Sequence, residues 1–123
     1  METKKRESTR FLIKQRAFLK LYLITNIEAD RAYGKQMLEE LQGAFKPFGY
    51  EPQHSEIYRA LHELLEDGVF ARTFIPKDGA AYQQVAIYKV ADQDKANAYK
   101  KLVKADLDRC MGILRKALED NYS

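Results

Sequence analysis

The apolar positions of this chain recur mainly at helical spacing. Residues 11–24 are apolar around most of a helix circumference, which predicts a helix at the centre of the fold. Apolar residues spaced by three and four predict a second helix from about residue 32 to residue 45, followed by a turn rich in Pro and Gly. A third predicted helix begins at His54 or Ser55 and ends at Gly68. The apolar face of that helix consists of Ile57, Ala60, Leu61, Leu64 and Leu65.

Two runs rich in aromatic and β-branched residues follow the third helix. Residues 69–75 and 82–90 predict a pair of strands, and residues 76–80, which include Gly79, predict a hairpin turn between them. Three helices, a two-stranded hairpin and a final helix are typical of a winged helix, in which the third helix enters the major groove of DNA. We therefore expect an α+β, mostly helical fold: a winged helix-turn-helix with a long C-terminal dimerisation helix.

The last predicted element runs from about residue 92 to residue 121 without a Pro. As one helix it would be about 45 Å long at about 1.5 Å per residue. A compact domain of 123 residues has a radius of gyration of only about 14 Å, so this helix cannot bury its apolar stripe against its own domain along its full length. The alternative is a shorter helix that is interrupted at Gly112 and folds back on the body.

We predict that this long helix pairs with a copy of itself, antiparallel or crossed, in a homodimer. In an antiparallel pair the middle of the apolar stripe lies near the two-fold axis, which places Leu107 and Cys110 there. The predicted dimer interface consists of Ala96, Tyr99, Val103, Leu107, Cys110, Leu114 and Ala117.

Length and composition narrow the class of protein. With 123 residues, of which 46% are hydrophobic, the chain suits one folded domain. We expect a basic N-terminal arm at residues 1–10, a winged-helix core at residues 11–90 and the dimerisation helix at residues 91–123. A single Cys excludes a disulfide framework and fits a reducing cytoplasm, where we expect the protein to lie on the nucleoid. Lys14, Arg16 and Lys20 interrupt the first apolar stretch, so neither a membrane span nor a signal peptide is expected.

The chain has few candidate catalytic or metal-binding residues. No acid pair, nucleophile–base set or Gly-rich phosphate loop stands out, so an enzyme is not expected. Two His and one Cys are too few for a typical structural zinc site, and neither a metal nor a cofactor is expected.

Basic residues gather near the N-terminus, although the net charge of the chain is only +3. The first 24 residues hold seven Lys or Arg and two Glu, a local balance of +5. A basic arm on a nearly neutral body suits a polyanion such as nucleic acid. The alternative is a solubilising, disordered terminus.

Short runs spread along nearly the whole chain are more specific than the winged-helix pattern. They are Phe11-Leu12, the run from Lys14 to Tyr22, Tyr33-Gly34, Phe45-Lys46, His54, Glu56, Tyr58-Arg59, the run from Leu61 to Leu65, Asp67-Gly68, Gly79-Ala80, the run from Leu107 to Cys110, and the run from Lys116 to Leu118. In these runs the chain resembles the replication terminator protein family of Gram-positive bacteria. The resemblance implies a symmetric dimer that is joined by its C-terminal helices and binds terminator DNA. It further implies that cooperating dimers block the replicative helicase, and so arrest a replication fork that arrives from one side.

The DNA contacts of that family, placed on matching positions, imply three surfaces. The arm and the first helix supply one surface, chiefly for phosphates, and the hairpin supplies another at Lys77. The third helix faces the major groove, where an Arg side chain is well suited to read O6 and N7 of guanine. The implied contacts are Ser8, Thr9, Lys14 and Arg16 on the arm and first helix, and Gln53, Ser55, Glu56, Tyr58 and Arg59 on the third helix.

Two of these assignments leave an alternative, and one surface departs from the family. Tyr58 lies at the margin of the apolar face, where half-packing in the core is the alternative to a DNA contact. Glu56 either accepts a hydrogen bond from a cytosine amine or favours the positive end of its own helix. The first wing strand carries Phe74 and fewer lysines than the family, and Arg10 and Arg72 are expected to compensate in part.

A small transcriptional repressor of the PadR-like type is the alternative function. Tyr33-Gly34 ahead of Met37-Leu38, together with the pattern of the third helix, also resembles that family. A repressor that senses a ligand is expected to carry an apolar pocket near its dimer interface. For a terminator, Tyr33 and Tyr88 are candidates for an exposed aromatic patch that contacts the helicase, and core packing of either Tyr is the alternative.

Overall fold

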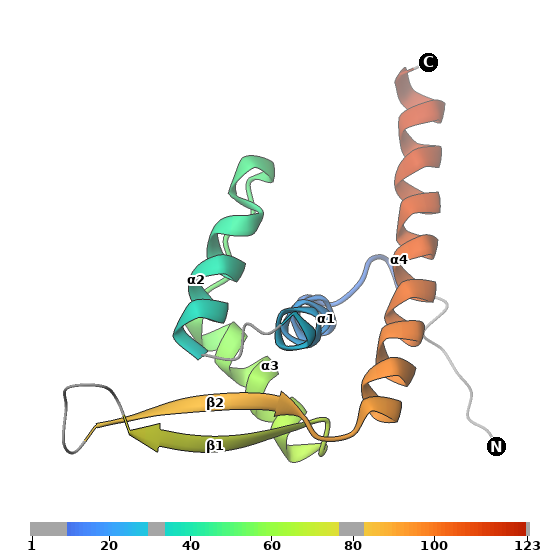
Figure 1. The fold of residues 1–123 in the computed structure, drawn as a ribbon. Coiled ribbons are helices and arrows are strands. Elements are labelled where there is room, and N and C mark those ends of the chain that lie inside the picture. Colours follow the sequence, from blue (N-terminus) through green and yellow to red (C-terminus); the bar gives the residue numbers. More distant parts are fainter. Residues whose placement is uncertain (1–9, 30–33, 77–82, 123) are drawn as a thin grey trace.

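The structure, a computed structural model, describes residues 10–29, 34–76 and 83–122. Its order of elements confirms the predicted fold class, with three helices, an antiparallel hairpin and one long final helix (Figure 1). The elements are α1 (Gln15–Glu28), α2 (Gly34–Ala44), the 3-10 helix η2 (Lys46–Phe48), α3 (His54–Glu66), β1 (Phe70–Pro76), β2 (Gln84–Val90) and α4 (Gln93–Tyr122).

Helix α1 lies at the centre of the fold, as its apolar circumference predicts. Leu19, Leu23 and Ile24 have no exposed surface, because α2, α3, β2 and α4 all pack against this helix (Figure 1). The helix begins at Gln15, four residues later than predicted. Lys14, just before it, has an extended backbone, and the Arg109 side chain accounts for the delay because it binds carbonyls of the preceding segment.

Helix α3 and the hairpin follow the predicted boundaries closely. Gly68 has a positive φ of 78°, which lets the chain leave α3 and enter β1 directly. Strands β1 and β2 pair antiparallel from Phe70 opposite Val90 to Pro76 opposite Gln84. Phe70 and Tyr88 lie in the core and Ala86 and Val90 pack against it, whereas β1 is exposed from Arg72 onward and the hairpin extends outward as a wing (Figure 1). The tip of the predicted turn, including Lys77, lies outside the described residues.

The described part of α4 is one unbroken helix of 30 residues, about 45 Å long at about 1.5 Å per residue. It continues through Gly112, so the alternative of an interrupted helix is wrong. Among the described residues, no helix is long and apolar enough to cross a membrane.

The apolar stripe of α4 is covered by its own protomer only along its first half. Ala96 is fully buried, Val103 is 4% exposed and Cys110 is 6% exposed, and Tyr99 packs against the core. The protomer itself therefore buries Ala96, Val103 and Cys110 and covers part of Tyr99, whereas their place in a dimer interface stays a prediction. Leu107 is half-buried, whereas Leu114 and Ala117 are exposed. Beyond Cys110 the helix projects past α1 (Figure 1), and several large apolar side chains of this segment are exposed. They are Met111, Leu114, Leu118 and Tyr122.

Candidate nucleic-acid interface

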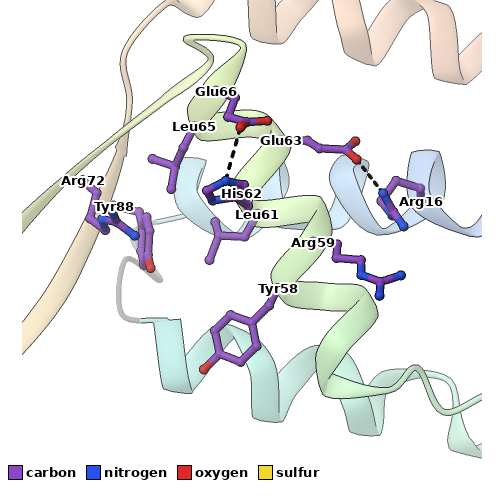
Figure 2. A pocket seen from close by; sticks show the side chains of 10 residues that line it. All are labelled: Arg16, Tyr58, Arg59, Leu61, His62, Glu63, Leu65, Glu66, Arg72 and Tyr88. Atoms are coloured by element: carbon purple, nitrogen blue, oxygen red, sulfur yellow. Dashed lines mark hydrogen bonds and ion pairs between the residues drawn. The ribbon is translucent and has the colours of Figure 1, made fainter.

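The outward face of α3 is the centre of the candidate interface. Ser55, Arg59, His62 and Glu66 are exposed on this face, whereas the opposite, apolar face packs into the core. A groove of about 460 Å³ runs along the exposed face, with the start of α1 on one side and the wing on the other (Figure 2). The groove is lined by Arg16, Tyr58, Arg59, Leu61, His62, Glu63, Leu65, Glu66, Arg72 and Tyr88. This arrangement fits the exposed recognition helix that the sequence predicts.

On the α1 side of the groove, cations and carboxylates are paired. Arg16 Nη1 lies 2.5 Å from Glu63 Oε2, and Arg16 Nη2 lies 3.2 Å from Glu56 Oε1. Lys20 Nζ approaches the other oxygen of Glu63 at 2.6 Å, and Arg59 Nη1 lies 3.5 Å from Glu56 Oε2. Arg16, expected to contact phosphates, is thus already engaged by two carboxylates.

These pairings favour the ionised forms of Glu63 and Arg16. The hydrogen bond from Lys20 lowers the pKa of Glu63, and the charges of Lys20 and Arg16 add to that effect. The hydrogen bond with Glu56 raises the pKa of Arg16 above its already high ordinary value. The Glu63 carboxylate therefore stays charged at neutral pH, where it accepts hydrogen bonds and repels anions.

On the wing side of the groove, the side chains are aromatic and basic. Tyr58 is 51% exposed, so it belongs to the surface of α3 rather than to the core. The guanidinium carbon of Arg72 lies 5.2 Å from the centre of the Phe74 ring, in the geometry of a cation–π contact. Tyr88 pairs across the sheet with Arg72 but is only 6% exposed. Tyr88 is therefore a core residue, which corrects its assignment to an exposed patch for the helicase.

The segment before α1 is fastened to α4. Arg10 Nη2 donates to Asp106 Oδ2 at 2.6 Å, and Arg109 donates to the backbone carbonyls of Arg10 and Phe11 at 2.6 and 3.1 Å. Burial alone would raise the pKa of Asp106, but hydrogen bonds from Arg10 and Arg109 outweigh it and lower that pKa. Arg10 is thus paired within the protomer, and its expected role as a compensating DNA contact stays a prediction.

The remaining predicted contacts lie at the start of α1 and the start of α3. Lys14 is exposed just before α1, and Gln53 and Ser55 are exposed where α3 begins. The Gln53 carbonyl accepts the first backbone hydrogen bonds of α3, which fixes its position at the helix N-terminus. Ser8, Thr9 and Lys77 lie outside the described residues, as does Tyr33.

Sequence reasoning placed Glu56 in this interface but gave no role to Lys20, Glu63, Asp106 or Arg109. The signal for Glu63 was its position seven residues after Glu56, which puts both carboxylates on one edge of α3. The other contacts join segments far apart in the chain and carry no local signal. In the described ranges, no group of three or more His, Cys, Asp or Glu side chains is placed to hold a metal ion.

Comparison with known proteins covers nearly the whole chain. Residues 10–122 match the sequence model of a family described as replication terminator protein. The replication termination protein of Bacillus subtilis strain 168 is 50% identical over 122 residues, which span 99% of this chain and 100% of that protein. The protein of the same name from Bacillus vallismortis matches with the same identity and coverage.

Solved structures share the fold at much lower identity. Pex from Synechococcus sp. strain PCC 7942 superposes with a TM-score of 0.58 at 16% identity, covering 76% of this chain and 83% of that chain. A PadR-like transcription factor from Bacteroides fragilis also gives a TM-score of 0.58, at 12% identity and with coverages of 84% and 92%. At these identities the likeness shows the fold alone.

Proposed function

The chain belongs to the replication terminator protein family, and from that membership we propose that it binds terminator DNA as a symmetric homodimer. Cooperating dimers on the DNA block the replicative helicase in one orientation and so arrest the fork. The observation that carries this proposal is the outward face of α3, where Arg59 lies exposed between basic side chains of α1 and the wing.

On DNA, α3 occupies the major groove and the flanking elements follow the phosphates. Arg59, with its side chain 65% exposed, is long enough to read O6 and N7 of a guanine. Lys14 and Arg72 contact phosphates on the two sides of α3, and these contacts position the protein without reading sequence. Gln53 and Ser55 lie at the helix N-terminus, a favourable place to meet a phosphate. Ser8, Thr9 and Lys77 remain proposed contacts from the family resemblance.

The dimer forms through the second half of α4. Met111, Leu114, Leu118 and Tyr122 are spaced by three and four, which places them on one face, and all four are about half exposed or more. A stripe of this kind is buried when it packs against the same stripe of a second copy. Leu114 and Ala117 of the predicted interface belong to this segment, and Leu107 lies at its border.

A PadR-like repressor is the second candidate function, and one observation favours it. A groove of about 550 Å³ lies beside α4, lined mainly by Ala17, Tyr99, Leu102, Val103 and the arm-binding pair Asp106 and Arg109. A largely apolar groove beside α4 supports this candidate, because a ligand-sensing repressor is expected to carry an apolar pocket near its dimer interface. The full-length identity of 50% to replication termination proteins outweighs it.

Selection of binding sites from random duplexes tests the proposal. The purified protein is expected to select a long bipartite site that two dimers occupy, whereas a single short palindrome would favour the repressor.

Substitutions separate base reading from phosphate contact. Arg59→Ala is expected to weaken the binding free energy by about 1–3 kcal/mol on the selected site and by much less on random DNA. Lys14→Ala should weaken binding to all duplexes and lower the salt slope by about one. An equal loss for Arg59→Ala on both duplexes would show that it contacts phosphate only.

The helicase contact is a separate part of the proposal. Tyr33, which lies outside the described residues, remains the candidate for it because it was expected to belong to an exposed aromatic patch. If it contacts the helicase, Tyr33→Ala will keep its DNA affinity and lose arrest. If arrest also persists, the barrier depends on DNA affinity alone.

A further inference from the structure

Five charged side chains form one connected cluster between α3 and the start of α1, here named the edge cluster. It consists of Arg16, Lys20, Glu56, Arg59 and Glu63. Glu63 binds Arg16 and Lys20 through its two oxygens, and Glu56 joins Arg16 to Arg59. Three cations and two carboxylates leave this edge with a net charge of only +1.

The two carboxylates lie where the proposed function requires phosphates to pass. Arg16, Arg59 and Glu63 line the groove along the exposed face of α3, and Figure 2 shows Arg16 and Arg59 on the same side of that helix. A carboxylate at this position repels a phosphate and holds a cation that could otherwise bind one. Glu56 and Glu63 therefore lower the electrostatic affinity of the edge for any duplex.

Stability of the fold is a weak reason for these carboxylates. The side chains of Glu63 and Glu56 are 39% and 26% exposed, and ion pairs this exposed contribute little to stability. Lys20 is the exception, because its side chain is only 14% exposed and Glu63 balances its charge. The stability of the fold therefore explains the contact of one Glu63 oxygen with Lys20, but not the contact of its other oxygen with Arg16.

We propose that Glu63 is a specificity-determining residue, a positioning group that holds Arg16 and suppresses binding to non-cognate DNA. The inference rests on the proposed binding of DNA by α3. On a random duplex the protein docks loosely, and a released Arg16 would turn to the nearest phosphate. On the cognate site the base contacts of α3 already fix the position of the backbone, so release of Arg16 gains less. Glu63 thereby widens the difference between the two affinities.

The test compares Glu63→Gln with the wild-type protein on the selected site and on a random duplex across a series of salt concentrations. Loss of the charge is expected to raise affinity for the random duplex several-fold and to steepen its salt slope by about one for each cation released. The affinity for the selected site should rise less, so the ratio of the two affinities falls.

Asp108→Asn is the matched control for the change in net charge. Asp108 lies on α4, outside the groove along α3, and pairs with Lys104 at 2.9 Å. Its substitution removes one negative charge without releasing Arg16, so it should shift both affinities by a similar small factor and leave the salt slope unchanged. If Glu63→Gln behaves in the same way as Asp108→Asn, the proposal is wrong.

A double-mutant cycle shows whether Glu63 acts through Arg16. In the background of Arg16→Gln, the further change Glu63→Gln should no longer alter the affinity ratio by the same factor. An unchanged effect in that background would contradict the proposed role.

A second variant covers the case in which Glu63→Gln leaves Lys20 unpaired and unfolds the protein. The double variant Lys20→Met with Glu63→Gln leaves Lys20 without a charge to pair and still frees Arg16 from Glu63, so that Arg16 keeps only its 3.2 Å contact with Glu56. The affinity ratio should therefore fall and the slope steepen by up to about one. No change in either quantity would overturn the inference. Failure of the proposed function looks different, because the wild-type protein would then select no DNA site.

Discussion

The two halves of α4 carry the same apolar stripe but meet different surroundings. In the first half, Ala96 and Val103 are buried by α1 and the rest of the protomer. In the second half, Leu118 and Tyr122 are 61% and 82% exposed. Periodicity therefore identifies the buried face of a helix, but the reach of the domain decides what covers that face. A domain of this size covers about half of a 45 Å helix, and a second copy can cover the rest.

The largest expected effect is in the first half of α4. Val103→Asp places a carboxylate in the interior of the protomer, where a buried unpaired charge is very costly. The free energy of unfolding should fall by at least several kcal/mol, a large part of what a small domain has. Circular dichroism with urea titration measures it. A variant as stable as the wild type would show that this half is not part of the core.

A charge placed in the second half of α4 should break the dimer and leave the protomer folded. Leu118→Asp places two like charges in the proposed seam of the dimer, so the protein should sediment as a monomer at micromolar concentration. The helical content should stay close to that of the wild type, because Leu118 is already 61% exposed in the protomer. A variant that still sediments as a dimer would remove the second half of α4 from the interface.

A smaller effect is expected at Asp106 of α4, which binds Arg10 from the segment before α1 and Arg109 on its own helix. Asp106→Asn should lower the free energy of unfolding by about 1–2 kcal/mol, since hydrogen bonds to a charged group are lost. Asp108→Asn is the control, because Asp108 pairs only at the surface with Lys104 and its side chain is 63% exposed. That control should stay within about 0.5 kcal/mol of the wild type.

The contribution of Asp106 should also depend on pH. Its pKa in the folded protein is lowered, so the stabilisation is fully present above the ordinary value of about 3.9 and is lost as the pH falls through the lower folded value. The difference in melting temperature between the wild type and Asp106→Asn should therefore shrink as the pH falls from 5 towards 2. A difference that stays constant over this range would contradict the ion pair.

The sequence predicted those features of the fold that depend on local signals. Helix α3 and its end at Gly68 follow from apolar spacing and from a glycine that adopts a positive φ. The late start of α1 was not predictable, because Arg109, which binds the carbonyls of Arg10 and Phe11, lies 99 and 98 residues away from them. The burial of Tyr88 has a similar cause, since it depends on how the base of the hairpin packs on the core.

In the candidate interface, too, local signals predicted the exposed residues but not the contacts between distant residues. The exposure of Arg59 was predictable from helix periodicity alone, and the structure places its side chain on the outward face of α3. The pairing of Arg16 with Glu63 joins residues 47 positions apart on two helices, and no pattern along the chain indicates it. The sequence therefore identified the surface and Glu56 on it, and the structure added Glu63 and the pairing of both carboxylates with Arg16.

Helicase unwinding of a forked duplex tests the central claim most directly. The duplex carries the selected site in either orientation, and the protein is present at saturation. A terminator is expected to block unwinding in one orientation and to permit it in the other. Free unwinding in both orientations, with the site fully occupied, would contradict fork arrest and leave the repressor as the better account.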